Sequence, residues 1–154
     1  MGLRDEIDAL YARYAFLLDE GPIAEWPSLF AADGSYRAMT RENVDRGWPL
    51  ALMLCESRAA IEDRVYAIEN LAMTIPRRVR HLISGFMIEE MQAGAAVTAN
   101  FAMFETLDGE QTQCVAAGRY RDILVRESDG RLLFREKVSI ADSAIVHNSL
   151  VFPF

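Results

Sequence analysis

The feature that most limits the fold is a repeated strand-and-turn pattern in residues 77–145, nearly half of the chain. Four long β-strands are expected there, at residues 77–90, 95–107, 110–126 and 131–145. Two of the three turns between them contain an Asp-Gly pair, Asp108-Gly109 and Asp129-Gly130. Such a pair between strand-like segments is the strongest local signal for a β-hairpin, because both residues readily adopt positive φ angles. The pattern therefore predicts a four-stranded antiparallel meander.

Side chains in these strands alternate with the period of two that places successive residues on opposite faces of a sheet. In the second strand, one face is expected to carry Val97, Ala99, Phe101 and Met103. In the fourth strand, one face is expected to carry Leu132, Phe134, Glu136, Val138 and Ile140, and the other Arg131, Leu133, Arg135, Lys137 and Ser139. Strands of this length twist and curl, so the sheet should wrap around the helical segments that precede it.

Three helices and one short strand are predicted before the meander. The helices are expected at residues 4–20, 23–31 and 58–73, and the strand at residues 35–39. Apolar residues of the first helix recur at the spacing of one helical face: Ile7, Leu10, Tyr11, Tyr14, Leu17 and Leu18. Ser57 is a suitable N-cap for the third helix. Residues 40–56 carry no readable pattern.

This order of elements predicts one α+β domain over residues 1–154, because helices precede a run of consecutive strands. A strongly curved antiparallel sheet around N-terminal helices is similar to the cone-shaped NTF2-like (cystatin-like) fold, named after nuclear transport factor 2.

Composition argues against two classes of partner. The chain has 23 acidic and 16 basic residues and a net charge of −7, whereas nucleic acids and anionic membranes attract basic surfaces. No apolar run reaches the ~18 residues of a membrane span, and the N-terminus is expected to be an acidic helix, not a signal peptide. Cys55 and Cys114 are far apart in the sequence and are expected to be reduced thiols. These features predict a soluble, cytoplasmic protein.

The sequence offers no set of residues for a metal centre. Its two histidines are His81 and His147. A Rieske iron–sulfur centre needs two Cys and two His ligands, and neither Cys here is followed by a His two positions later. An iron site with two His and one carboxylate would need both histidines, one in a long strand and one near the C-terminus. P-loop, GxGxxG and GxSxG motifs are absent. We therefore expect no metal or cofactor in this chain.

An acid–base site is the catalytic alternative. His81 with Asp33, and with Tyr14 or Tyr36 as a hydrogen-bond donor, would suit dehydratase-like or isomerase-like chemistry in the cavity of a cone. The competing interpretation is that His81 is a hydrogen-bonded residue at a strand edge or a subunit contact. Four aromatic residues, including Tyr14, have the spacing of core residues: Tyr11, Tyr14, Trp26 and Phe30.

Two segments are candidates for contact with another chain. Arg77, Arg78 and Arg80 can bind an anion or the carboxylates of a partner, or they can be solvated or paired with acids of this chain. The apolar residues 150–154 either fold back over the sheet or pack against another chain, with Phe152 and Phe154 as the candidate contacts.

Five motifs, in this order, resemble the small (β) subunits of aromatic-ring-hydroxylating, Rieske-type dioxygenases. They are residues 25–30 (EWPSLF) with Asp33 and Tyr36, residues 58–65 (RAAIEDRV), residues 78–84 (RVRHLIS), residues 118–122 (GRYRD) and residues 132–142. Glu42-Asn43 followed by Gly47 is most similar to small subunits acting on aromatic carboxylates such as salicylate, terephthalate or benzoate.

The resemblance implies a cone-shaped subunit that forms a trimer under three large (α) subunits, an α3β3 assembly. It also implies that the large subunit carries the Rieske 2Fe-2S cluster and a mononuclear iron. A reductase, sometimes with a ferredoxin, would supply electrons from NAD(P)H. The small subunit would be structural, with no catalytic residues.

Three hypotheses follow from the sequence. The first is a non-catalytic, structural β subunit of a multicomponent aromatic-ring-hydroxylating dioxygenase. The second is a stand-alone cone-fold enzyme that uses His81 and Asp33 in acid–base catalysis. The third is a small-molecule-binding module without catalysis.

Overall fold

A computed structural model of the protein describes residues 1–72, 76–146 and 152–154. Its helices are α1 (Leu3–Asp19), α2 (Arg41–Asp45), α3 (Arg58–Asn70) and the 3-10 helix η1 (Ile23–Leu29). Its strands are β1 (Phe30–Thr40), β2 (Met53–Cys55), β3 (Arg77–Met91), β4 (Gly94–Leu107), β5 (Gln113–Arg126) and β6 (Leu132–Ala141).

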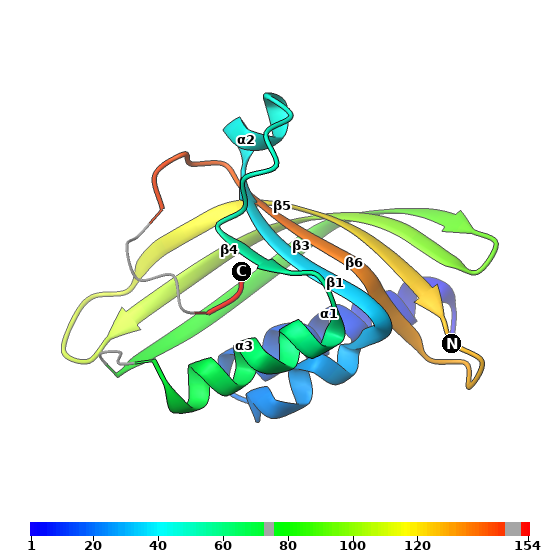
Figure 1. Ribbon diagram of the computed structural model, residues 1–154, viewed down its shortest axis with the longest axis horizontal. Coiled ribbons are helices and arrows are strands. Elements are labelled where there is room, and N and C mark those ends of the chain that lie inside the picture. The colour runs from blue at the N-terminus through cyan, green and yellow to red at the C-terminus, as the bar shows by residue number, and fades with distance from the viewer. Residues whose placement is uncertain (73–75, 147–151) are drawn as a thin grey trace.

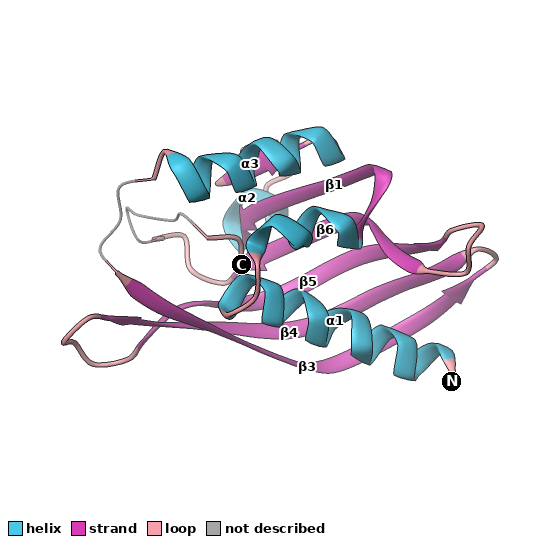
Figure 2. Ribbon diagram, turned by 90° about the horizontal axis from the view of Figure 1, so that it is seen from below, coloured by secondary structure: helices cyan, strands magenta, loops and turns pink. Residues whose placement is uncertain are grey.

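All these strands belong to one six-stranded sheet with the order β2-β1-β6-β5-β4-β3. Strands β3 to β6 form the predicted antiparallel meander, whereas β1 pairs with β6 in parallel and with β2 in antiparallel orientation. The sheet curves, and helices α1 and α3 run along the same side of it (Figures 1 and 2). The α+β class and the curved-sheet cone are thus confirmed.

The core lies between α1 and the concave face of the sheet. The buried face of α1 consists of the six predicted residues, Ile7, Leu10, Tyr11, Tyr14, Leu17 and Leu18. Aromatic rings fill the space opposite them: the ring of Phe134 lies 5.3 Å from that of Tyr11 and 5.7 Å from that of Tyr14. The predicted core positions Trp26 and Phe30 are both fully buried. Edge-to-face contacts such as these add to the stabilisation from apolar burial.

The first half of the sheet differs most from the sequence prediction. Strand β1 begins at Phe30, where the end of a helix was expected, and it continues through Asp33-Gly34. An Asp-Gly pair is typical of a turn, but here it lies at an irregularity in the pairing of β1 with β6. A side chain at position 34 would meet the backbone oxygens of Ala31 and Phe134 at 2.8 and 2.9 Å, so glycine is needed for close backbone contact.

Two short elements were not predicted, α2 and β2, and both lie in the unreadable region 40–56. Thr40 caps α2 by accepting a hydrogen bond from the backbone N–H of Asn43. The predicted cap of α3 is confirmed, because the Ser57 side chain accepts a hydrogen bond from the N–H of Ala60 at 3.2 Å. The predicted end of this helix, residue 73, lies outside the described residues, and α3 ends at Asn70.

Candidate functional site

An ion pair lies at the centre of the cone. The Nζ of Lys137 on β6 lies 2.9 Å from Oδ2 of Asp122 on β5, and neither side chain is exposed to solvent. The same carboxylate accepts hydrogen bonds from the hydroxyl of Tyr11 and, at 3.1 Å, from the backbone N–H of Val138. A buried charge of this kind is tolerated only when it is paired and hydrogen-bonded, as both charges are here.

This pair corrects the predicted faces of the fourth strand. Near the turn of the β5–β6 hairpin, Arg126 pairs with Leu132. If this register continued without a break, Asp122 would lie opposite Glu136. A bulge between Ile123 and Leu124 shifts the register, so that Lys137 lies opposite Asp122. Beyond the bulge Lys137 and Ser139 point into the core, and the expected single face from Leu132 to Ile140 is wrong.

Aromatic rings surround the Lys137 ammonium group. Its Nζ lies 3.4, 4.4, 4.8 and 4.9 Å from the ring centroids of Tyr120, Tyr14, Phe134 and Tyr11. The negative faces of these rings stabilise the cation, whereas loss of water around it favours the neutral amine. Burial lowers the pKa of Lys137 to about 8, against the opposing effect of Asp122. Burial likewise raises the pKa of Asp122, although Lys137 and Tyr11 oppose this shift.

His81 is held at a second buried pair, with Asp19 at the end of α1. Its Nδ1 lies 2.5 Å from Oδ1 of Asp19, and its backbone N–H donates to Oδ2 at 2.8 Å. The ring Nε2 lies 3.0 Å from the backbone oxygen of Pro153. A carbonyl oxygen only accepts, so Nε2 donates to Pro153, and the contact with Asp19 requires a second proton on Nδ1 or on the carboxyl group. His81 is therefore the hydrogen-bonded strand residue of the competing interpretation.

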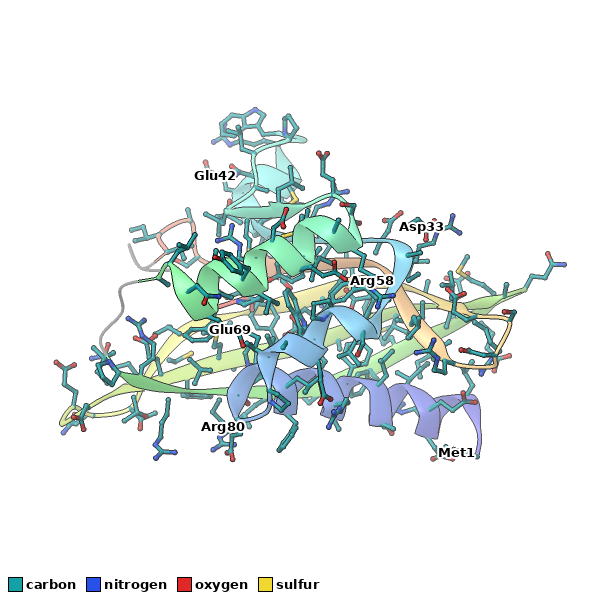
Figure 3. The ribbon with its side chains drawn as sticks, turned by 60° about the horizontal axis from the view of Figure 1, so that its bottom comes forward. Met1, Asp33, Glu42, Arg58, Glu69 and Arg80 are labelled. Atoms are coloured by element: carbon teal, nitrogen blue, oxygen red, sulfur yellow. The ribbon has the colours of Figure 1, made fainter. Side chains whose placement is uncertain are left out.

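The structure does not bring Asp33 to His81. Asp33 lies on β1, its side chain is 65% exposed, and its carboxylate pairs with Arg135 at 3.1 Å. In Figure 3, Asp33 lies at the upper right and Arg80, the neighbour of His81, at the lower left, with helices between them. Tyr14 does lie beside His81, with its ring edge-on at 6.3 Å, but its hydroxyl donates to the backbone oxygen of Phe154.

The carboxylate partner that sequence reasoning missed is Asp19. It lies one residue after the apolar face of α1 ends at Leu18, a place where a helix side chain can still reach the sheet. Asp122 and Lys137 were missed because only the bulge brings them together.

Residues 152–154 lie against the core of their own chain, which agrees with the alternative that the apolar C-terminal residues fold back. Phe154 is buried within its own chain, and the backbone N–H of Phe154 donates to the Tyr36 hydroxyl at 2.9 Å. Phe154 is therefore not accessible as the predicted contact with another subunit, whereas Phe152 is only partly buried. Residues 150 and 151, together with His147, lie outside the described residues.

The three arginines before His81 have different environments. Arg77 is largely buried and pairs with Glu105 at 2.7 Å. Arg80 is exposed and pairs with Glu20 at 2.6 Å. Arg78 is exposed. With acidic residues of α1 and of the β4–β5 turn, Arg77 and Arg78 line an open pocket of about 620 Å³.

Apolar side chains also gather on the outside, on a segment of residues 41–52 that we call the arm. The arm contains α2 and projects from the body of the molecule beyond the sheet (Figure 1). Trp48 and Leu50 are 44% and 62% exposed, and Leu52 is 40% exposed. The guanidinium group of Arg46 lies over the Trp48 ring at 4.8 Å and also pairs with Glu42. The arm thus presents apolar surface beside a charge that is already paired.

Within residues 1–72, 76–146 and 152–154, no three His, Cys, Asp or Glu side chains are grouped as metal ligands. Cys55 is buried and Cys114 is exposed, and burial raises the pKa of the Cys55 thiol. This donor set does not fit an iron–sulfur cluster. In the described part of the chain, no helix is long and apolar enough to cross a membrane.

Comparison with known proteins gives a consistent result. The model of the family described as ring hydroxylating beta subunit matches residues 13–147. The anthranilate 1,2-dioxygenase small subunit of Burkholderia cepacia is 30% identical over 149 residues, which cover 96% of this chain and 92% of that protein. The terephthalate 1,2-dioxygenase terminal oxygenase component subunit beta 2 of a Comamonas species is 25% identical over 152 residues and 96% of both chains.

A solved structure agrees with these relatives. It was assigned as the beta subunit of an aromatic-ring-hydroxylating dioxygenase from Novosphingobium aromaticivorans. The two structures superpose with a TM-score of 0.87 at 30% identity, over 97% of this chain and 95% of that one.

Proposed function

Because this chain belongs to the ring hydroxylating beta subunit family, we propose that it is the non-catalytic, structural subunit of an aromatic-ring-hydroxylating dioxygenase. Its role is to trimerise and to hold three large subunits in an α3β3 assembly. The redox groups, a Rieske 2Fe-2S cluster and a mononuclear iron, belong to the large subunit in this proposal. A reductase, with or without a ferredoxin, delivers the electrons.

The non-catalytic role is supported by the way in which side chains fill the interior of the cone. Its polar side chains contact one another, Lys137 with Asp122 and His81 with Asp19, and both contacts are buried. A general base must reach the proton that it removes, and a nucleophile must reach the substrate. Aromatic rings and the C-terminal segment occupy the space in which a substrate would meet these groups. This packing supports a structural role.

The stand-alone acid–base enzyme has less support. It requires His81 and Asp33 in one cavity, and the exposed Asp33 pairs instead with Arg135. Replacing Asp33 by Asn should therefore leave the activity of the assembled oxygenase unchanged.

We propose an aromatic carboxylate as the substrate of the assembled enzyme. The named relatives belong to dioxygenases of anthranilate and of terephthalate, and both compounds carry a carboxylate on an aromatic ring. In this proposal, the large subunit selects the substrate.

We assign the contact with the large subunit to the arm. An exposed Trp beside leucines is typical of the anchor residues that dominate the binding energy of protein interfaces. Because Arg46 pairs with Glu42, contact of a partner with Trp48 does not desolvate an unpaired Arg46 charge. Arg78 and Arg80 remain predicted contacts, because their exposed guanidinium groups can bind carboxylates of a partner.

The test is co-expression of this chain with a ring-hydroxylating large subunit of the aromatic-carboxylate class. We expect the two to purify together in equal numbers, with aromatic-acid oxidation that requires the large subunit and a reductase. The chain purified alone should neither bind iron stoichiometrically nor oxidise the substrate. Stoichiometric iron in the isolated chain, or turnover by it, would contradict the proposal.

A further inference from the structure

Four polar side chains from four different elements converge on the last two residues of the chain. The backbone oxygen of Pro153 accepts from Nε2 of His81 on β3 at 3.0 Å. The backbone N–H of Phe154 donates to the hydroxyl of Tyr36 on β1 at 2.9 Å. The backbone oxygen of Phe154 accepts from the hydroxyl of Tyr14 on α1 and, at 3.4 Å, from that of Ser139 on β6. The Pro153 oxygen, the Phe154 N–H and one Phe154 oxygen are therefore each hydrogen-bonded to a side chain.

The Phe154 side chain lies in an aromatic stack. Its ring is nearly parallel to that of Phe101, with an interplanar angle of 22° and centroids 5.8 Å apart. Phe101 in turn stacks on Tyr120, with centroids 4.6 Å apart and an angle of 12°. The position of the Phe154 ring is therefore bounded by two stacked aromatic rings. We call this position the ring slot, and its shape favours aromatic ligands over aliphatic ones.

The pocket also holds a polar group that the segment does not use. The Tyr120 hydroxyl is fully buried and has no hydrogen-bond partner among the described residues. The Tyr120 ring stacks on Phe101, which in turn stacks on Phe154, and burial raises the pKa of Tyr120. A buried hydroxyl without a partner is costly in a stable core, whereas it is expected in a pocket built for a ligand.

We propose that this pocket, formed by Tyr14, Tyr36, His81, Phe101, Tyr120 and Ser139, is a binding site for small aromatic acyl compounds. Pro153 and Phe154 are its internal occupant, and a free ligand displaces them. The ligand class is a flat ring held within a few bonds of a carbonyl or carboxylate oxygen, because the pocket offers a ring slot and hydroxyl donors for that oxygen. The proposal goes beyond the structural role and does not depend on it.

The effective concentration of the tethered residues Pro153 and Phe154 sets the ligand concentration that is needed to displace them. A tethered segment competes at an effective concentration in the millimolar range, so a free ligand should bind the intact chain only weakly. Removing the segment removes this competitor. The affinity of the same ligand should then rise by roughly 10²-fold or more.

The probe is N-acetyl-L-phenylalaninamide, which reproduces the ring, the N–H and both carbonyl oxygens of the segment. Binding is measured by calorimetry on the chain of residues 1–154 and on a variant that ends at residue 151. We expect saturable binding to the shorter variant, at least about 100-fold tighter than to the full chain. The D-enantiomer, with the ring and the amide in the wrong relation, serves as the control and should bind at least tenfold more weakly. Absence of saturable binding to a folded short variant would overturn the proposal.

A second measurement uses the full chain, so the proposal stays testable if the short variant does not fold. Phenylalanine is replaced throughout by 4-fluorophenylalanine, and the Phe154 signal is assigned by comparison with Phe154→Leu. Adding the probe at millimolar concentration should shift the Phe154 fluorine resonance toward that of a solvent-exposed ring. A resonance that stays unchanged at saturating probe would contradict displacement.

A substitution in the pocket tests the assignment of the contacts. Tyr36→Phe removes the hydroxyl that accepts the N–H and should weaken probe binding to the short variant by about tenfold, as expected for loss of one hydrogen bond. Tyr66→Phe removes an exposed hydroxyl on α3 and is the matched control, with no expected change. Equal effects of the two substitutions would contradict the assignment.

Discussion

The interior of the cone and the arm on its surface use polar and apolar groups in opposite ways. Inside, the titratable side chains Lys137 and His81 are buried, and each contacts a carboxyl group of the same chain. Outside, the apolar side chains of Trp48 and Leu50 are exposed on a projecting segment. The interior is complete within one chain, whereas the surface of the arm becomes buried only through contact with another molecule.

This difference indicates where function lies in the molecule. A subunit that supports other subunits needs a well-packed body and a surface for external contact; the core supplies the first, and we propose that the arm supplies the second. Disturbing the interior should therefore change the stability of the chain, whereas disturbing the arm should change assembly and leave stability nearly unaffected. The following predictions test this separation.

The largest effect is expected from breaking the central ion pair. Asp122→Ala leaves the Lys137 ammonium buried without its carboxylate and should lower the free energy of unfolding by about 3–5 kcal/mol. Urea denaturation at pH 7 measures the change. The control is the double variant Asp122→Leu with Lys137→Met, which removes both charges and should recover most of the loss. A single variant as stable as the parent chain would show that the pair does not support the fold.

A smaller loss is expected at the second buried pair. Asp19→Asn weakens the bonds to the ring and the backbone N–H of His81 and should cost about 1–3 kcal/mol. Glu20→Gln, at the exposed neighbouring position, is the matched control, with an expected change within about 0.5 kcal/mol. Thermal and urea unfolding of the two variants distinguish them. Equal stabilities would mean that His81 is not held through Asp19.

The interior should also give the protein an unusual dependence of stability on pH. The pKa of Lys137 is lowered from 10.5 to about 8, so between these values the unfolded chain binds more protons than the folded chain. Lys137 should therefore make stability rise with pH above 8, by up to about 1.4 kcal/mol per pH unit, while the raised pKa of the Cys55 thiol acts in the opposite direction above pH 9. Above pH 10 the slope should reverse, because burial raises the pKa of Tyr11, Tyr14 and Tyr120 and the unfolded chain loses tyrosine protons first.

Urea denaturation in steps of half a pH unit from 7 to 10 measures this dependence. Lys137→Met should lack the rise between pH 8 and 10. The stability of the parent chain relative to Lys137→Met should increase over this range, and a difference that stays constant or shrinks would contradict the lowered pKa of Lys137.

The smallest effect on stability is expected at the arm. The double variant Trp48→Ser with Leu50→Ser should change the free energy of unfolding of the isolated chain by about 0.5 kcal/mol or less, because both side chains are exposed. Its affinity for the large subunit should nevertheless fall, by about tenfold or more if Trp48 is an anchor residue. Tyr66→Ser on α3, also well exposed, is the control for general loss of surface apolar area. If the arm variant assembled with the large subunit as well as the parent chain does, the contact with the large subunit would not be on the arm.

The sequence predicted the parts of the fold that depend on local patterns. The Asp-Gly turns, the alternation in β4, the apolar face of α1 and the Ser57 cap are signals within a few residues, and the structure confirms each of them. The first strand was predicted over residues 35–39, whereas β1 spans Phe30–Thr40. The prediction was too short because Asp33-Gly34 has the composition of a turn but lies within β1.

The site was less predictable because it depends on pairings over long range. One bulge decides whether Asp122 faces Lys137 or Glu136, and no residue near the turn signals it. Likewise, Asp19 meets His81 only through the docking of α1 against β3, across 62 residues of sequence. Asp33 was a reasonable partner by residue type and the wrong one by position.

The most direct test of the proposed role is the native mass of this chain co-expressed with a large subunit, measured by light scattering after size exclusion. We expect one species that contains three copies of each chain, with 17.3 kDa contributed by each copy of this one. Loss of that species in the Trp48→Ser, Leu50→Ser variant would place the contact on the arm. Elution of this chain as a separate 17.3 kDa species, with the large subunit assembling and active without it, would contradict a supporting role.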